Sequence, residues 1–241
     1  MQPDGKILAA GVSETRPGML DFALVRYNSD GTRDSSFGAN GIVTTDLGGE
    51  SDDAAAVALQ PDGEIVAVGG TDQYVGLARY LPDGRLDPTF GGAGAVVSNI
   101  GTDLAKGVAI TPAGTILVAG TRGNPKGHED IMLASYAPNG TLNRGFGQFG
   151  IAQADLSGAE DFGNDLVLRP DGNIVVVGSA TGANLASDMA LVRFRPDGIV
   201  AASLTTDFNG ASDSGNALAI DPEGRIVAAG TSGDEFALMR A

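Results

Sequence analysis

The sequence predicts an all-β fold: a five-unit β-propeller of four-stranded antiparallel blades whose terminal blades are incomplete. Three observations predict it. One turn element, written around Pro-Asp-Gly or a close variant, occurs five times, with its proline at residues 3, 61, 112, 170 and 222. The prolines are therefore 58, 51, 58 and 52 residues apart, and such a period is typical of solenoids, propellers or arrays. Short apolar runs of strand length separate the turns.

Each repeat contains four segments, A to D. Segment A alternates small and apolar residues, as in Ala56–Leu59, and segment B, which follows the turn, is β-branched and apolar, as in Ile65–Gly69. This composition favours strands over helices. In the turn, Pro sets φ, Asp bonds to the backbone and Gly adopts the left-handed conformation. We therefore expect A and B to form an antiparallel hairpin.

Segment C, as in Val75–Tyr80, alternates like a strand with one buried face. A second Gly-containing turn leads to segment D, which carries a Phe-Gly step and an apolar run such as Gly41–Thr44. The fourth copy of D, Ile199–Phe208, is shorter and lacks the Phe-Gly step. We expect C and D to form a second hairpin. The glycines that end segment B, such as Gly69 and Gly178, are expected at bends or where two strands approach closely.

Segments B and C occur five times, but A and D only four times, so the first repeat lacks A and the last lacks D. A four-stranded sheet has two apolar faces, and packing against its neighbours buries both. We expect one β-propeller domain over residues 1–241, built of repeats of about 51–58 residues, closed imperfectly or cut from a longer array. Open blade edges predict self-association. A solenoid or a sandwich is the alternative architecture.

Composition excludes several classes of function. The chain carries 30 acidic and 15 basic residues, for a formal net charge of −15, and such a surface repels nucleic-acid phosphates and anionic membranes. No apolar run is long enough to span a bilayer. We therefore expect no nucleic-acid partner and no membrane insertion. With no cysteine and one histidine, thiol chemistry and zinc sites built from several His or Cys ligands are excluded.

An aspartate opens segment A in four repeats. The four are Asp52, Asp103, Asp161 and Asp213. If this strand lines a central channel, the carboxylates form a ring that could hold Ca²⁺ through oxygen ligands. The alternative is that each aspartate accepts backbone N–H groups where the chain enters the strand. No cofactor other than Ca²⁺ is expected.

Other charged positions repeat as well. Acids in the C–D turns loosely resemble calcium loops but lack the distal Glu, which favours hydrogen-bonded hairpin turns; they are Asp30, Asp34, Asp83 and Asp87. An acid precedes segment C in four repeats, and we interpret it as a turn anchor and not as a ligand. The four acids are Asp21, Asp130, Asp188 and Glu235. An arginine near the end of segment C is expected to pair with acids of a neighbouring blade; it is Arg26, Arg79, Arg193 or Arg240.

The single histidine, His128, lies in the polar loop 122–130. No Gly-x-Ser-x-Gly motif accompanies it, so we interpret it as a solvated loop residue and not as part of a catalytic triad. No Gly-rich phosphate-binding motif is present. A pair of carboxylates of the glycosidase type stays open, although the chain lacks Trp.

The pattern Q-P-D-G-x-I-x-x-x-G, followed by F-A-L-x-R-Y-x-x-D-G-x-x-D-x-x-F-G, is clearest in residues 2–38 and 60–91. It resembles the delta-60 repeat family and, more loosely, NHL and SMP-type propeller repeats. The resemblance implies a propeller in an extracellular or cell-surface bacterial protein, mostly without an assigned activity.

The leading expectation for function is a non-enzymatic scaffold or binding module with a protein or glycan partner, because the repeats are nearly equivalent and catalysis normally breaks symmetry at one place. The first alternative is a carboxylate-dependent hydrolase or lyase with a site at the channel mouth. The second is a calcium-stabilised adhesion module. The least symmetric places are loops 123–129 and 181–187 and the fourth segment D, where a partner is expected to bind first.

Overall fold

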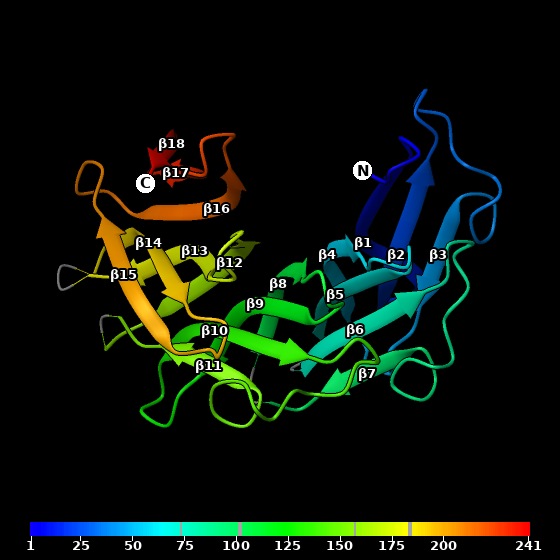
Figure 1. The fold of residues 1–241 in the computed structure, drawn as a ribbon, viewed down its shortest axis with the longest axis horizontal. Helices are drawn as coiled ribbons and strands as arrows, with labels where there is room; N and C mark the ends of the chain where they lie inside the picture. The colour runs from blue at the N-terminus through cyan, green and yellow to red at the C-terminus, as the bar shows by residue number, and fades with distance from the viewer. Residues whose placement is uncertain (73, 101–102, 157, 183–184) are drawn as a thin grey trace. The chain divides into compact units, whose positions relative to one another are not determined.

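A computed structural model describes residues 1–241 with the exception of 73, 101–102, 157 and 183–184, and the side chain of Asp103 also lies outside the described part. The described residues form strands β1 to β18, which group into five antiparallel sheets (Figure 1). No helix that could cross a bilayer occurs among them. We number the sheets as blades one to five in chain order.

The strands follow one another through the blades as the repeats do. Blade one contains β1 (Ile7–Arg16), β2 (Met19–Tyr27) and β3 (Ile42–Thr45). Blade two contains β4 (Asp52–Leu59), β5 (Ile65–Thr71), β6 (Tyr74–Tyr80) and β7 (Ala95–Ser98). Blade three contains β8 (Asp103–Ile110), β9 (Ile116–Gly123), β10 (Glu129–Tyr136) and β11 (Ile151–Ala154). Blade four contains β12 (Asp161–Leu168), β13 (Ile174–Thr181), β14 (Ser187–Phe194) and β15 (Val200–Thr206). Blade five contains β16 (Asp213–Ile220), β17 (Ile226–Ser232) and β18 (Glu235–Arg240).

Within every blade the spatial order of the strands is their order in the chain. The turn between β4 and β5 shows why: Gly63 has φ +90°, and its N–H donates to the carbonyl of Gln60 over 3.0 Å. A residue with a Cβ is strained in that conformation. The predicted A–B and C–D hairpins are confirmed.

The terminal blades are the incomplete ones. Blade one begins with a strand of type B, and blade five ends with a strand of type C, so each has three strands where the others have four. The predicted fold, a five-unit β-propeller of four-stranded antiparallel blades with incomplete ends, is therefore confirmed.

The chain divides into two compact units. The first comprises Met1–Ile116 and Ala137–Thr141, and the second comprises Leu117–Tyr136 and Leu142–Ala241. The expectation of one domain over residues 1–241 stays a prediction.

In each unit, blades pack face to face. In the first unit β4 packs against β1 and β2, and Phe22, Leu24 and Ile65 are fully buried in one cluster with Tyr80. The Tyr80 hydroxyl donates to Thr45 Oγ1 over 2.8 Å, and burial raises the Tyr80 pKa to about 12. Each large aliphatic side chain buried in this way stabilises the unit by about 1.5–3 kcal/mol.

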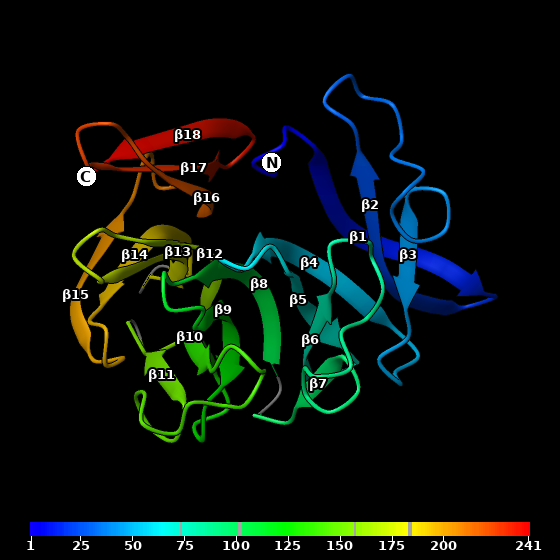
Figure 2. The same ribbon diagram turned by 45° about the vertical axis from the view of Figure 1, so that its right-hand side comes forward.

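In the second unit β16 packs against β12, β13 and β14 (Figure 2). Val177, Met189 and Ala228 are fully buried at this contact. This contact is built from small and aliphatic residues, whereas aromatic side chains such as Phe22, Tyr80 and Phe194 are fully buried elsewhere in the described core.

The glycines that end the B strands allow a close approach of two backbones. A Cβ at Gly69 would lie 1.8 Å from the carbonyl oxygen of Asp53, beside a register shift between Ala54 and Ala56. At Gly178 the corresponding distance, to the Phe162 oxygen, is 1.7 Å. The interpretation of these glycines as close strand approaches is confirmed, because no side chain fits in the space.

Blade four differs in its outer strand. β15 spans seven residues, whereas β3, β7 and β11 span four each. In blades one to three the chain makes a detour between the C and D strands that buries the Phe of the Phe-Gly step, for example Phe90. Without this detour, β15 pairs with β14 directly from Phe194 and Val200 onward. The shorter fourth segment D thus gives a longer strand.

Candidate functional site

A seven-residue segment of the form Asp-[Leu/Phe]-x-Gly-x-x-Asp links the D strand of one blade to the A strand of the next. It occurs three times, at 46–52, 155–161 and 207–213. In each copy the last aspartate accepts, through Oδ2, the N–H of the second residue. Leu47 donates to Asp52 over 2.6 Å, Leu156 to Asp161 over 2.6 Å, and Phe208 to Asp213 over 2.8 Å. The alternative role weighed for these aspartates, as acceptors of backbone N–H groups at the strand entrance, is confirmed.

The same geometry brings three carboxylates together at each of these places. The third carboxylate comes from the start of the C strand of the preceding blade. We call the groups the first-blade cluster (Asp21, Asp46, Asp52), the third-blade cluster (Asp130, Asp155, Asp161) and the fourth-blade cluster (Asp188, Asp207, Asp213). In each cluster, one carboxylate oxygen per residue lies within 4.8 Å of the other two.

Three of the four aspartates expected to ring a channel fall in separate clusters, and the fourth is not described. Asp52, Asp161 and Asp213 each join a separate cluster, and the side chain of Asp103 lies outside the described residues. The role of these four as metal ligands stays a prediction. Between blades two and three the sequence also lacks the other acids, since Tyr74 and Asn99 stand at the matching positions.

Sequence reasoning missed the first aspartate of each linking segment, namely Asp46, Asp155 and Asp207. It also favoured a turn anchor over a ligand for Asp21, Asp130 and Asp188. The seven-residue segment with an aspartate at each end was the signal that could have revealed the clusters.

The third-blade cluster is distinguished by the loop between β9 and β10. This loop places the Lys126 ammonium 2.9 Å from Asp155 Oδ2 and His128 Nδ1 3.3 Å from Glu160 Oε1. The backbone N–H of Glu129 donates to the other Glu160 oxygen over 2.8 Å. The prediction that His128 is merely solvated is wrong in this respect, because the imidazole is oriented by a carboxylate.

The environment moves the pKa values of this cluster in opposite directions. Burial, together with the nearby Asp155 charge, raises the pKa of Asp130 despite the hydrogen bond from Asn124. The hydrogen bond from Lys126 lowers the pKa of Asp155. The Glu129 N–H, and then His128, lower the pKa of Glu160. Neighbouring acids with displaced pKa values are the arrangement that general acid–base catalysis uses.

Among the described residues, no Lys, Arg or His pairs with the fourth-blade cluster. The side chain of Asp188 makes no hydrogen bond or ion pair there, and burial followed by the charges of Asp207 and Asp213 raises its pKa. Asp213 is 1% exposed, and its Oδ1 has no hydrogen-bond partner among the described residues. No positively charged side chain of the described residues offsets the repulsion between these carboxylates.

The first-blade cluster is intermediate. Arg16 pairs with Asp46 over 3.2 Å at the exposed end of the cluster, and the Thr15 hydroxyl donates to Asp21. Oδ1 of Asp21 and Oδ1 of Asp52 are buried without a partner in the described part of the molecule.

The arginines of the C strands were expected to make exposed pairs with acids of neighbouring blades, and this is wrong for two of them. Arg26 Nε donates to Asp34 over 2.8 Å, and Arg79 Nε donates to Asp87 over 2.8 Å, in both cases within one blade and buried. Arg79 also donates to the Pro138 carbonyl over 2.7 Å. Each aspartate lies beside the arginine of its own blade because the segment that leads to the Phe-Gly step folds back over the C strand.

The turn acids behave as the hairpin interpretation predicts. Asp30 Oδ1 accepts the N–H of Thr32 over 2.9 Å, and Asp83 Oδ1 accepts the N–H of Arg85 over 3.1 Å. These bonds lower the pKa of both carboxyls, the largest contributions being the Thr32 side chain at Asp30 and the Arg85 N–H at Asp83.

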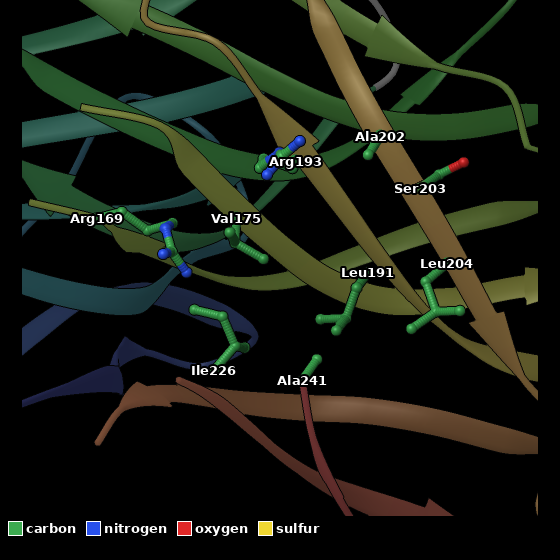
Figure 3. A pocket seen from close by; sticks show the side chains of 9 residues that line it. All are labelled: Arg169, Val175, Leu191, Arg193, Ala202, Ser203, Leu204, Ile226 and Ala241. Carbon is green, nitrogen blue, oxygen red and sulfur yellow. The ribbon is translucent and has the colours of Figure 1, made fainter. Parts of the chain in front are cut away.

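An open pocket of about 260 Å³ lies between blades four and five (Figure 3). Ala201 stands where blades one and two have Asp34 and Asp87, so Arg193 lacks the acid of its blade and lines this pocket with Arg169. The remaining walls are mostly aliphatic. The pocket suits an anionic group, but none of its lining side chains carries a carboxyl or an imidazole, so it offers no group for proton transfer at neutral pH.

Three segments of the chain, 2–37, 60–90 and 169–198, match the model of a β-propeller family described as a domain of unknown function (DUF5122). No curated protein sequence matches the chain. The match and the fold together identify the repeats as propeller repeats.

Solved structures similar to this chain include a glucose dehydrogenase, with 14% identity over 99% of this chain and 77% of that one, and a TM-score of 0.61. A streptogramin B lyase is 11% identical over 97% of this chain and 72% of that one, with a TM-score of 0.54. An endo-arabinase from Bacteroides thetaiotaomicron is 9% identical over 100% of this chain and 89% of that one, with a TM-score of 0.51. At these identities the likeness establishes the fold.

The leading expectation, a non-enzymatic scaffold or binding module, is wrong against these findings. It depended on the argument that nearly equivalent repeats disfavour catalysis, yet the similar propellers are enzymes. The physical reason is that catalysis requires only one place in a propeller where a loop makes one repeat different from the others. The β9–β10 loop does so here by adding Lys126 and His128 to a cluster that occurs three times.

Proposed function

We propose that the protein is a carboxylate-dependent hydrolase or lyase whose reacting groups lie in the third-blade cluster and the adjoining His128–Glu160 pair. The observation that supports it is the contact between His128 and Glu160 beside acids whose pKa values are displaced in opposite directions. No other cluster in the described part of the chain combines an imidazole with several carboxylates.

His128 is the general base. Glu160 stays ionised because the Glu129 N–H and His128 lower its pKa, and it faces Nδ1 of the ring. Nε2 is then the nitrogen that takes a proton from water or from a substrate C–H group. The side chain of His128 is 40% exposed, so a substrate can reach it. Oriented bases of this kind accelerate reactions by about 10²–10⁴-fold.

Asp130 is the matching acid. It is 4% exposed, and burial raises its pKa, so it retains a proton to higher pH than an ordinary aspartate and can donate it to a leaving group. Asp155 remains ionised beside Lys126. The site therefore holds a base, His128, that can take a proton and an acid, Asp130, that can give one.

The substrate class follows from the chemistry of acids and bases alone. Glycans, lactones and carboxylic esters are split by such groups, and a glycan substrate agrees with the expected glycan partner. We further infer, from the delta-60 resemblance, an extracellular or cell-surface location and a single propeller domain over residues 1–241.

The experiment is a hydrolysis and elimination screen on glycans, lactones and esters with the whole chain. For a substrate that is turned over, His128→Gln is expected to lower kcat/KM at least 100-fold and Glu160→Gln by about tenfold or more. Asp46→Asn, which changes the matching acid of the first-blade cluster, is the control and should leave the rate unchanged. Equal rates for the wild type and His128→Gln would contradict the proposal.

A further inference from the structure

The fourth-blade cluster presents a charge imbalance that its own protein neighbours do not compensate. Asp188, Asp207 and Asp213 each direct one oxygen to within 4.8 Å of the others, and no Lys, Arg or His of the described chain pairs with any of them. Three carboxylates held this close repel one another, so a folded chain needs a reason to keep them together.

A second observation is independent of the acids. Ser232 lies directly opposite Asp213 in the β16–β17 register, so their side chains stand on the same face of the sheet. Ser232 is 7% exposed, and its Oγ, like Asp213 Oδ1, is buried without a hydrogen-bond partner in the described residues. Two buried polar side chains that stand at paired positions and have no hydrogen-bond partner point to a further ligand beside them.

The remaining carboxylate oxygens are already ordered by the backbone. Asp213 Oδ2 accepts the Phe208 N–H over 2.8 Å, and Asp207 Oδ1 accepts the Asn209 N–H over 3.0 Å. These bonds hold the two aspartates in place and leave one oxygen of each for a ligand. The site is therefore preorganised by the seven-residue linking segment.

We propose that the fourth-blade cluster is a Ca²⁺ site whose protein ligands are Asp188, Asp207 and Asp213, with Ser232 Oγ adjoining. All donors are oxygens, which hard cations prefer. The three carboxylate oxygens lie within 4.8 Å of one another, close enough for one ion to contact all three. Ca²⁺ accepts several carboxylates in a flexible geometry, whereas Mg²⁺ demands an octahedral sphere and gives up its waters reluctantly.

The third-blade cluster shows the alternative solution. There the Lys126 ammonium lies 2.9 Å from Asp155 and Asn124 donates to Asp130 over 2.7 Å, so protein groups supply what the ion supplies in blade four. The proposal does not depend on the proposed enzymatic function, since it concerns different residues and is read out without turnover.

The test is isothermal titration of the whole chain with CaCl₂, together with melting scans in EDTA and in Ca²⁺. The wild type should bind Ca²⁺ more tightly than Mg²⁺ and melt at a higher temperature in Ca²⁺. Asp188→Asn should weaken binding at the cluster at least tenfold, and Ser232→Ala should weaken it by a smaller factor. Asp171→Asn removes an equal charge from an exposed turn of the same unit and should bind like the wild type.

The side chain of Asp188 contributes no hydrogen bond to the described fold, and Asp188→Asn keeps the backbone pairing with Ala180. The variant is therefore expected to fold, and its melting in EDTA checks this directly. Ca²⁺ affinity equal to the wild type in Asp188→Asn would overturn the proposal. Absence of both a binding heat and a melting shift at millimolar Ca²⁺ would overturn it as well.

Discussion

The third-blade and fourth-blade clusters have the same backbone design but differ in whether a positively charged side chain pairs with their aspartates. In both, a seven-residue segment begins and ends with aspartate, and the last aspartate accepts a backbone N–H. In blade three a loop adds Lys126 and His128, whereas in blade four no cation of the described chain approaches the acids. The repeated backbone thus sets where the carboxylates meet. The loop before the C strand decides whether a side chain of the protein or an ion from solution neutralises them.

The largest expected difference between the clusters is in stability. Asp161→Ala and Asp213→Ala each leave one backbone N–H without its acceptor, which costs about 1–3 kcal/mol. In Ca²⁺ at 100 times its Kd, Asp213→Ala should lose a further ~2.7 kcal/mol of ligand stabilisation, and Asp161→Ala should not. Urea unfolding in EDTA and in Ca²⁺ measures both. A calcium dependence of equal size in the two variants would remove the distinction between the clusters.

Removing its cation should make the third-blade cluster behave like the fourth-blade cluster. Lys126→Met removes the ammonium beside Asp155 and leaves three carboxylates as in blade four, so the chain should bind one additional equivalent of Ca²⁺ in a calorimetric titration. Lys126→Arg keeps the positive charge and is the matched control, with unchanged stoichiometry. If Lys126→Met binds no more Ca²⁺ than Lys126→Arg, charge balance is not what separates the clusters.

The smallest expected effect is the pH dependence of the Lys126–Asp155 pair. The folded pKa of Asp155 lies below its ordinary 3.8, so its contribution is present above that value and is lost as pH falls through the folded pKa. The folded pKa of Lys126 lies above 10.5, so its contribution is present below that value and is lost as pH rises further. The Lys126 side chain is exposed and that of Asp155 is half-exposed, so solvent screening keeps the effect small.

The measurement is the difference in melting temperature between the wild type and Lys126→Met in EDTA. It should be constant between about pH 5 and 9, and it should shrink below the ordinary Asp pKa and above the ordinary Lys pKa. Lys106→Met, which removes an exposed ammonium from β8, is the control, and its difference from the wild type should not change at either pH limit. A difference that grows on acidification has the wrong sign for this ion pair.

Much of the architecture was readable in the sequence because local chemistry decides it. The Pro-Asp-Gly turn requires a left-handed glycine, as at Gly63, and strand-length apolar runs on both sides can only pair as hairpins. Gly69 could be assigned to a close approach for the same reason, since the repeat places a glycine where a Cβ would meet a carbonyl oxygen.

The candidate sites were less predictable. Asp161 was singled out because it opens a strand, but its partners Asp130 and Asp155 lie 31 and 6 residues before it in the chain, and only sheet pairing brings them together. The same holds for His128 and Glu160, which are 32 residues apart. Arg79 was expected at an exposed pair, and the detour that buries Phe90 places Asp87 beside it instead.

The sequence by itself determined the repeat, the hairpins and the incomplete terminal blades, because turns and strand periodicity depend on residues close together in the chain. Only the tertiary structure decided which carboxylates meet and which of them find a cation. Those outcomes depend on distances between residues on separate strands, and the Coulomb interactions that displace pKa values or favour an ion fall off over a few ångströms.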